Sequence, residues 1–407
     1  RKAVQEEEGD AFHGDGQASA GWPGAGAESV AQPGGPRRYL GGMHRLLPLL
    51  FACLPAWAVA TEYQVPPGDV ARFFRTLPED ATSVVFSGSG EYTANDDIAL
   101  PPRPMLVIDG RGCTLRLGPE SRGFTCAVPD QRAAMERISS RYVIRDFAVI
   151  EGGRSAISLA ATMGSSVRNV KCVRQTEAAV DLRFCLLARL EQVFVTNPVA
   201  AGFVLRQGDW PGATAFNSQC NSSVLDQCRV NCSKTSTDAF RILNSGGVEL
   251  RACVSEGAPC AHDLFLSART DGNEAEPADN TVVKSFLARD LHIEHAARTA
   301  SIHVNMPSKA AVTLSNIYWN GPQTAPVIRY TMGQLNLEDI GWWHESFRIV
   351  TRISAPRINA QRCHSGLDVG DPKAIKGNRA GVLELRDAVP GNTQLKLTYV
   401  RVRERSM

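Results

Sequence analysis

Four side chains in the second half of the chain are of types that perform acid–base chemistry, and they stand at matching places in a repeated phrase. His292 and Tyr318 each follow an apolar residue of the phrase, and Glu256 and Glu294 lie three residues after that apolar residue in their own copies. An imidazole and a phenol held together can act as base and acid in a β-elimination. A pair of carboxylates can instead hydrolyse a glycosidic bond. These four are the candidate catalytic residues.

Three further residues occupy the same two positions in other copies of the phrase. They are Arg229, Asn320 and Trp343. A guanidinium can pair with the carboxylate of a uronic acid, and an indole can stack on the face of a sugar ring. We predict that these three bind substrate and share one groove with the four candidate catalytic residues. The plain alternative is that all seven are solvated surface residues.

Metal binding is not predicted at these positions. The segment HIEH, together with His303, offers three imidazoles, but His292 and His295 do not share a face of a strand because side chains alternate between its faces. No cofactor is expected from the residues themselves.

A repeated strand must position these residues. The phrase reads apolar, any residue, a polar slot, an apolar anchor, any residue, apolar. The anchors are Phe147, Val170, Val193, Cys228, Cys253, Leu291, Ile317 and Ile340. The slots before them are Asp146, Asn169, Gln192, Gln227, Ala252, Asp290, Asn316 and Asp339. We expect the anchors to form one buried column and the slots a polar ladder at a turn.

A second apolar alternation follows each anchor by ten to twelve residues. It is centred on Ile157, Val180, Phe203, Phe240, Leu264, Ile302 and Ile328. A repeat of 23 residues that already holds these short strands has no room for a helix, which excludes leucine-rich and helical solenoids. A coil whose turns stack about 4.8 Å apart remains. Two Gly-, Pro- and Asn-rich insertions, residues 207–222 and 268–281, would wall a groove beside the predicted site.

The chain resembles the right-handed parallel β-helix, pectate-lyase-like superfamily over roughly residues 65–340. The residues that carry the likeness are Gly90, Tyr92, Leu100, Pro101, Ile108, Asp109, Gly110, Gly112 and Leu115, after an amphipathic segment at 69–78 with Asp69 as its cap. The resemblance implies an all-β fold, an N-terminal capping helix that closes the coil, and calcium as a conceivable cofactor. The motifs of galacturonan hydrolases, pectate lyases and alginate epimerases are absent, so no specific activity follows.

The ends of the chain differ in composition from the repeat. Residues 1–42 have no apolar period, and we interpret them as a non-native upstream segment or a disordered tail. Residues 43–60 read as a signal peptide ending in Ala58-Val59-Ala60, with a lipoprotein signal at Cys53 as the alternative. Residues 61–345 would be the β-helix, and 346–407 a C-terminal β cap or appendage.

The charge and cysteine content limit which partners and cross-links we expect. Residues 61–407 carry 39 basic and 36 acidic residues, which gives no electrostatic case for nucleic acid. No later segment is apolar enough to span a bilayer. The stacked Cys228 and Cys253 favour a ladder of thiols over a disulfide.

The sequence thus predicts a secreted or periplasmic protein that binds a polysaccharide and that, as an enzyme, would cleave it as a lyase or glycoside hydrolase. A non-catalytic carbohydrate-binding or cell-surface adhesion protein is the alternative.

Overall fold

A computed structural model describes residues 61–88, 90–270, 285–295, 297–307, 310–320, 327–330, 334–339 and 341–342, and the backbone of six later strands. The chain separates into the units Arg1–Ala58 and Val59–Met407, and everything below concerns the second. The predicted signal peptide and upstream segment lie outside the described residues.

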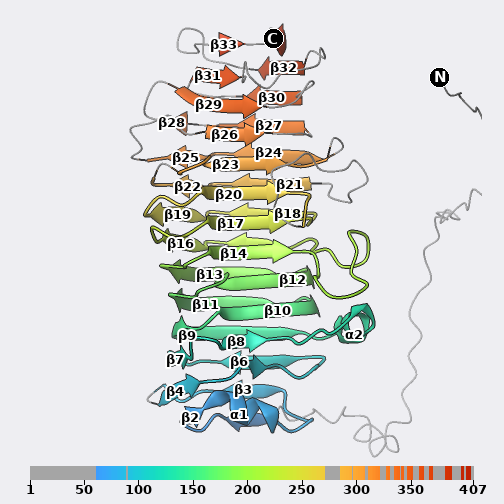
Figure 1. Cartoon of the computed structure of the whole chain (residues 1–407), viewed down its shortest axis with the longest axis vertical. Helices are drawn as coiled ribbons and strands as arrows, with labels where there is room; N and C mark the ends of the chain where they lie inside the picture. Colours follow the sequence, from blue (N-terminus) through green and yellow to red (C-terminus); the bar gives the residue numbers. More distant parts are fainter. Residues whose placement is uncertain are drawn as a thin grey trace, which may run out of the picture. The chain divides into compact units, whose positions relative to one another are not determined.

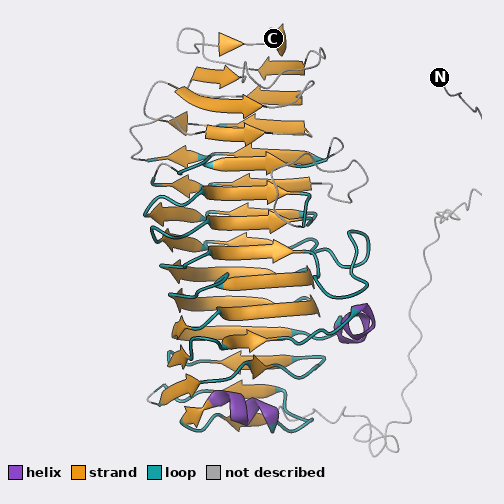
Figure 2. Cartoon of the chain, viewed as in Figure 1, coloured by secondary structure: helices purple, strands orange, loops and turns teal. Residues whose placement is uncertain are grey.

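The second unit is a right-handed coil of parallel strands, as the sequence predicts (Figures 1 and 2). Each turn visits three ladders in the same order before the next turn stacks on it.

The first ladder carries the strand that precedes the polar slot. Its strands are β1 (Glu62–Gln64), β3 (Ser83–Val85), β6 (Leu106–Asp109), the first parts of β9 (Tyr142–Gly152), β11 (Ser166–Val173) and β13 (Arg189–Thr196), then β15 (Val224–Asp226), β18 (Val248–Arg251), β21 (Ser285–Arg289), β24 (Ala311–Ser315), β27 (Gln334–Glu338), β30 (Arg357–Gln361), β32 (Gly381–Arg386) and β34 (Val400–Glu404).

The second ladder begins just after the slot. Its strands are β2 (Gly68–Asp69), β4 (Glu91–Ala94), β7 (Thr114–Leu117), the second parts of β9, β11 and β13, then β16 (Arg229–Cys232), β19 (Val254–Gly257), β22 (His292–Ile293), β25 (Tyr318–Trp319) and β28 (Gly341–Trp342).

The third ladder is a separate sheet. It contains β5 (Ile98–Ala99), β8 (Arg122–Thr125), β10 (Ser155–Met163), β12 (Val180–Leu186), β14 (Ala201–Arg206), β17 (Asp238–Leu243), β20 (His262–Ser267), β23 (Ile302–Asn305), β26 (Val327–Tyr330), β29 (Ser346–Thr351), β31 (Gly366–Val369) and β33 (Lys396–Leu397).

The polar slot is a left-handed corner between the first two ladders. All eight slot residues have positive φ, from 47° at Ala252 to 59° at Asp146. Asn and Asp tolerate this conformation better than most residues because their short polar side chains bond locally. Slots on adjacent turns also bond to each other, as Asn169 Nδ2 does to Asp146 Oδ1 at 2.9 Å and Asn316 Nδ2 to Asp290 Oδ1 at 2.6 Å. The predicted polar ladder at a turn is confirmed.

The predicted core columns are confirmed as well. Phe147 pairs with Val170 and Val170 with Val193, and the pairing of the residues that follow the later anchors keeps the same register through Ile317. These seven anchors are at most 2% exposed. Ile340 lies outside the described residues. The second alternation forms the inner column of the third ladder, from Ile157 to Ile328, in the predicted register.

The repeat implies that the residue three positions after an anchor faces outward, as Glu256 does after Cys253, but this is wrong for Ile150 after Phe147. The register between β9 and β11 shifts after Val170, so Ile150 pairs with the inward Cys172 and is fully buried. A β-bulge of this kind adds a residue to one strand and reverses the facing of those that follow. Glu151, not Ile150, therefore pairs with Val173.

Two short helices accompany the strands. α1 (Val70–Arg75) takes the place of a third-ladder strand in the first turn, and Asp69 caps it by accepting a hydrogen bond from the Ala71 amide at 3.1 Å. Phe74 of α1 packs on Phe124 with ring centroids 5.8 Å apart. The helix thus lies at the N-terminal end of the coil (Figure 1), and its capping role stays a prediction.

α2 (Gln131–Arg137) interrupts the chain between β8 and β9 and was not predicted. The sequence signal for this helix is Asp130 followed by a run of good helix formers. In the structure the Asp130 side chain accepts a hydrogen bond from the Ala133 amide at 2.8 Å. Neither described helix has the length or apolarity that crossing a membrane requires.

The C-terminal strands extend the two sheets. β30, β32 and β34 pair in parallel above β27, and β29, β31 and β33 above β26. The predicted boundary of a cap or appendage at residue 346 stays a prediction.

Candidate functional site

The predicted catalytic and binding residues gather on the outer face of the second ladder. Arg229 pairs with Val254, Val254 with His292, and His292 with Tyr318 on successive turns. Glu256 and Glu294 follow two residues after Val254 and His292, so they lie on adjacent turns. Asn320 is exposed at the equivalent position of the next turn, three residues after the anchor Ile317. Trp343 lies outside the described residues.

Glu256 is held by basic and amide donors. Arg229 Nε donates to Glu256 Oε1 at 2.7 Å, its Nη2 also bonds the carboxylate, and Asn231 Nδ2 donates to Oε1 at 3.1 Å. Glu256 is only 6% exposed. Three donor atoms already bond to this carboxylate. Glu256 is therefore better suited to orient Arg229 than to act as one of two carboxylates that hydrolyse a glycosidic bond.

His292 and Tyr318 are in direct contact. Their rings meet edge to face with centroids 4.8 Å apart at 64°. His292 Nε2 lies 3.6 Å from Glu294 Oε1, just beyond hydrogen-bond length. The structure therefore brings together an imidazole, a phenol and a carboxylate that belong to two turns of the coil.

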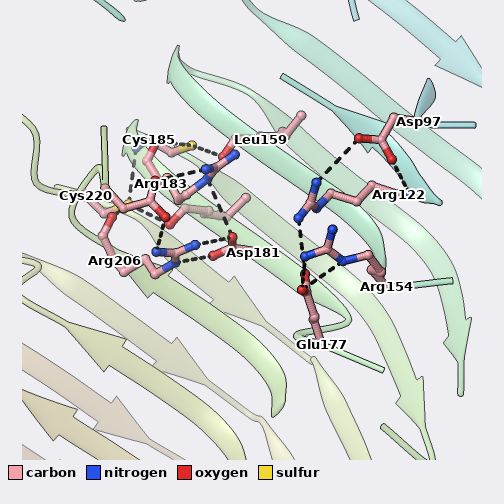
Figure 3. A network of polar contacts seen from close by, with 12 residues as sticks. Asp97, Arg122, Arg154, Leu159, Glu177, Asp181, Arg183, Cys185, Arg206 and Cys220 are labelled. Carbon is pink, nitrogen blue, oxygen red and sulfur yellow. Dashed lines mark hydrogen bonds and ion pairs between the residues drawn. The ribbon is translucent and has the colours of Figure 1, made fainter. Parts of the chain in front are cut away.

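The described residues also form a hollow that the sequence interpretation missed, on the outer face of the third ladder. It has a volume of about 380 Å³ and is lined mainly by charged residues of β8, β10, β12, β14 and their connections. Figure 3 shows its ion pairs. A volume in this range is typical of small-ligand sites.

Asp181 and Asp209 form one half of the network. Arg206 binds Asp181 with two bonds, Nε to Oδ1 at 2.8 Å and Nη2 to Oδ2 at 2.9 Å (Figure 3). Arg206 Nη1 also donates to Asp209 at 2.7 Å, and Arg183 Nη1 donates to Asp209 at 3.0 Å. Two guanidiniums and two carboxylates thus fix one another.

Glu177 anchors the other half. Arg154 binds Glu177 Oε1 through Nε at 2.9 Å and through Nη2, and Arg122 Nη2 lies 3.6 Å from the second oxygen. The backbone amide of Arg122 donates to Asp97 at 2.7 Å. Arg122 and Arg154 keep about a third of their side chains exposed, so they can still offer donors to a ligand.

The pKa values of three charged groups in the hollow are shifted in the direction that favours the ionised form. Burial pushes the pKa of Asp209 upward, but Arg206 and Arg183 outweigh this effect and hold that pKa below its ordinary value. Burial pushes the pKa of Arg206 downward, and the carboxylates of Asp181 and Asp209 raise it overall. The hydrogen bond that Arg154 donates to Glu177 raises the pKa of Arg154. Ionised side chains fixed around a concavity suit the binding of a ligand through charge-assisted hydrogen bonds.

The insertion at residues 207–222 forms a wall of this hollow. It supplies Asp209, and Trp210 anchors it by packing on Phe184 and by donating from Nε1 to Gln131 Oε1 of α2 at 2.9 Å. The expectation that this insertion walls a groove is met on a different face from the one predicted. The second insertion lies largely outside the described residues.

A sequence signal for the hollow existed. Asp181, Arg183 and Arg206 stand beside the anchors of the second alternation, in "AVDLR" and "GFVLR". The predicted site, by contrast, consists of outward positions along the first alternation.

Further along the same face the side chains are covered. His262 Nδ1 lies 2.8 Å from Asp238 Oδ1, and Arg241 bonds the other oxygen at 2.8 Å. Arg241 also lies over the Phe265 ring, 4.9 Å from its centroid. Phe265 and the neighbouring His303 are at most 2% exposed. His262, Phe265 and His303 are thus buried on this stretch of the face, whereas the hollow is open to solvent.

Calcium does not fit the charged residues of the hollow. It takes six to eight oxygen ligands, whereas guanidiniums engage the carboxylates there. In the described residues, one group of at least three His, Cys, Asp or Glu side chains has ligand atoms close enough to share an ion, namely Cys260, Asp263 and His295. A thiol and an imidazole do not suit calcium.

No protein-family model and no curated protein matches the sequence. Among solved structures, the chain is similar to the catalytic domain of a GH87 alpha-1,3-glucanase in complex with nigerose, with a TM-score of 0.48 and 12% identity over 85% of this chain and 68% of that one. It is also similar to the surface protein and adhesin PfbA of Streptococcus pneumoniae, with a TM-score of 0.42 and 8% identity over 82% and 94%. Function must be inferred from the side chains of this chain.

Proposed function

We propose that this chain is an exported β-helix protein that binds an acidic or neutral polysaccharide in the hollow on its third ladder. The observation that carries the proposal is the row of Arg122, Arg154, Arg183 and Arg206 on four successive turns around one concavity. Three carboxylates of the lining hold these guanidiniums in place.

The repeat of the coil supports a chain-like ligand. Turns stack about 4.8 Å apart, so the four arginines cover about 14 Å. One step is close to the length of a pyranose unit in an extended polysaccharide. Arg122 pairs with Ser155 of β10, whereas Arg183 pairs with Ala160 of the same strand, so a chain-like ligand would cross the hollow obliquely to meet both pairs of arginines.

The ion pairs support sugar recognition because they are already oriented. Guanidiniums donate to hydroxyl or uronate oxygens in pairs, and carboxylates accept from vicinal hydroxyls. Side chains fixed before binding lose little conformational entropy on binding. The lining has four arginines against three carboxylates, which leaves a slight preference for an acidic chain.

Affinity electrophoresis against a panel of neutral and acidic polysaccharides tests this proposal, with calorimetry on the best ligand. Arg122→Gln combined with Arg154→Gln should weaken binding by about tenfold or more, since two charge-assisted bonds are each worth roughly 1.5–3 kcal/mol. Arg168→Gln is the matched control, because Arg168 is an exposed arginine of β11 outside the hollow. Equal losses in both variants, or none in the double variant, would exclude the hollow as the binding site.

A second candidate function is β-elimination at the second ladder. The contact between His292 and Tyr318 favours it, because the two rings already lie together on an outer face. His292→Gln and Tyr318→Phe should each lower the appearance of unsaturated, ultraviolet-absorbing product by about 10² or more, while the unfolding midpoint stays nearly constant. Turnover equal to the parent in both variants would leave a non-catalytic binding or adhesion role.

Export is part of the proposal. Cleavage after Ala58-Val59-Ala60 would give Thr61 as the mature N-terminus. N-terminal sequencing of material from a secreting host decides it, and a lipid on Cys53 would instead place the protein at a membrane surface.

A further inference from the structure

Three side chains that can bind a transition metal converge inside the coil, away from both outer faces described above. Cys260 lies just before β20, Asp263 lies in β20, and His295 follows β22 on the next turn. Their ligand atoms lie within 4.8 Å of one another. Cys260 and Asp263 are fully buried, and His295 is 6% exposed.

The separations of these atoms are close to those around a tetrahedral ion. Cys260 Sγ lies 3.4 Å from His295 Nε2 and 3.8 Å from Asp263 Oδ1. Zinc bonds of about 2.3 Å to sulfur and 2.0–2.1 Å to nitrogen or oxygen give neighbouring ligand atoms roughly 3.4–3.6 Å apart. His295 Nε2 and Asp263 Oδ1 are closer, at 2.7 Å, because a hydrogen bond joins them.

One oxygen of the Asp263 carboxylate is free to bind an ion. Ser255 Oγ donates to Asp263 Oδ1 at 2.7 Å, whereas Asp263 Oδ2 has no hydrogen-bond partner among the described residues. A buried oxygen without a partner costs free energy, and the cost is larger when the group is charged. An ion bound through Oδ2 would remove that cost and leave the serine bond intact.

We propose that Cys260 Sγ, His295 Nε2 and the Asp263 carboxylate bind one Zn²⁺ ion. A thiolate, an imidazole and a carboxylate together match the preferences of zinc and not those of calcium or magnesium. Burial of all three residues favours a structural site over a catalytic one.

The ion would join successive turns where the repeat is least regular. Asp263 and His295 are separated along the chain by the second insertion, residues 268–281. A cross-link that closes a long loop stabilises the fold by restricting the unfolded chain. The site is independent of the polysaccharide proposal, because none of its residues lines the hollow.

The test is metal analysis of the purified full chain. After incubation with Zn²⁺ and removal of excess ion, the chain should retain about one zinc per molecule, and a strong chelator should lower its unfolding midpoint. Cys260→Ala, Asp263→Asn and His295→Gln should each abolish retention. Cys253→Ala is the matched control, because Cys253 is an equally buried free cysteine outside the cluster and should retain zinc.

Two measurements keep the proposal testable if those variants fail to fold. Ser255→Ala removes only the hydrogen bond to Asp263, and it should weaken zinc binding by about 10–100-fold. Cobalt bound by the unaltered chain should give a thiolate-to-metal charge-transfer band. Absence of retained zinc, cobalt binding without that band, or a disulfide at Cys260 in the purified chain would each overturn the proposal.

Discussion

Ala252 provides a sharp test of the left-handed corner. It occupies a slot with φ of 47°, where seven equivalent positions hold Asp, Asn or Gln. It is exposed, so a longer side chain meets no steric barrier from the core. We expect Ala252→Asn to stabilise the protein.

The magnitude follows from the backbone. An ordinary L-residue loses about 1–2 kcal/mol in the left-handed region, and Asn recovers part of this loss through local bonding. The new amide would also lie between Gln227 and Asp290, where it can bond as Asn316 does to Asp290. Exposed bonds of this kind add about 0.5 kcal/mol, so the expected gain is about 1 kcal/mol. Ala252→Gly removes the strain but costs roughly 0.5–1 kcal/mol in chain entropy, and should gain less.

Urea unfolding followed by far-ultraviolet circular dichroism measures the effect. The midpoints should rank Asn highest, then Gly, then the parent, with Ala252→Val lowest because a β-branched residue is poorly tolerated at positive φ. A midpoint for Ala252→Asn at or below that of the parent would refute the account of the corner as a strained position relieved by polar side chains.

Three other predictions concern the core, the insertion and the hollow. Phe147→Ala should cost about 3–5 kcal/mol, because its ring packs within 5.1 Å of Phe86 and 5.3 Å of Phe124 between centroids; urea unfolding checks this value. Trp210→Ala should speed proteolysis within residues 207–222, since the insertion loses its anchor, and mapping the cut sites tests this. The folded-state pKa of Asp209 lies below its ordinary value of 3.8, so its charge stabilises the fold above that value and the contribution is lost as pH falls through the lowered pKa. Asp209→Asn should therefore show a flatter loss of stability in acid, measured by thermal unfolding across pH.

The coil could be predicted from the sequence because one physical rule generates it. Each turn must bury an apolar residue after a left-handed corner, and this requirement produces the same sequence pattern around Val170, Val193 and Leu291. The rule fails where a turn gains a residue, as at the bulge that turns Ile150 inward. A single extra residue leaves no trace in composition, so the pattern alone does not reveal it.

The sites were harder to predict because side chains that project from the same face of a ladder do not always contact each other. Glu256 was expected as a catalytic carboxylate, yet its use by Arg229 and Asn231 depends on side-chain conformations that spacing does not specify. The hollow required Asp209, which comes from an irregular insertion with no repeat to place it. Cys260 and His295 likewise lie at corners between strands, where the two-residue period ends.

The constant offset between turns has a consequence for how chains of this kind diverge in length. Phe147, Val170 and Val193 pair across β9, β11 and β13 at intervals of 23, and Ile157, Val180 and Phe203 do so on the third ladder. Loss or duplication of 23 residues would therefore reconnect the same partners and only shift the remaining turns along the axis. Such a change between β8 and β14 would remove or repeat members of the hollow. Beyond this segment the intervals are unequal, as between Phe194 and Arg229 and between Arg229 and Val254. The part of the coil whose regular repeat would most easily allow a change in length is therefore the part whose length the hollow fixes.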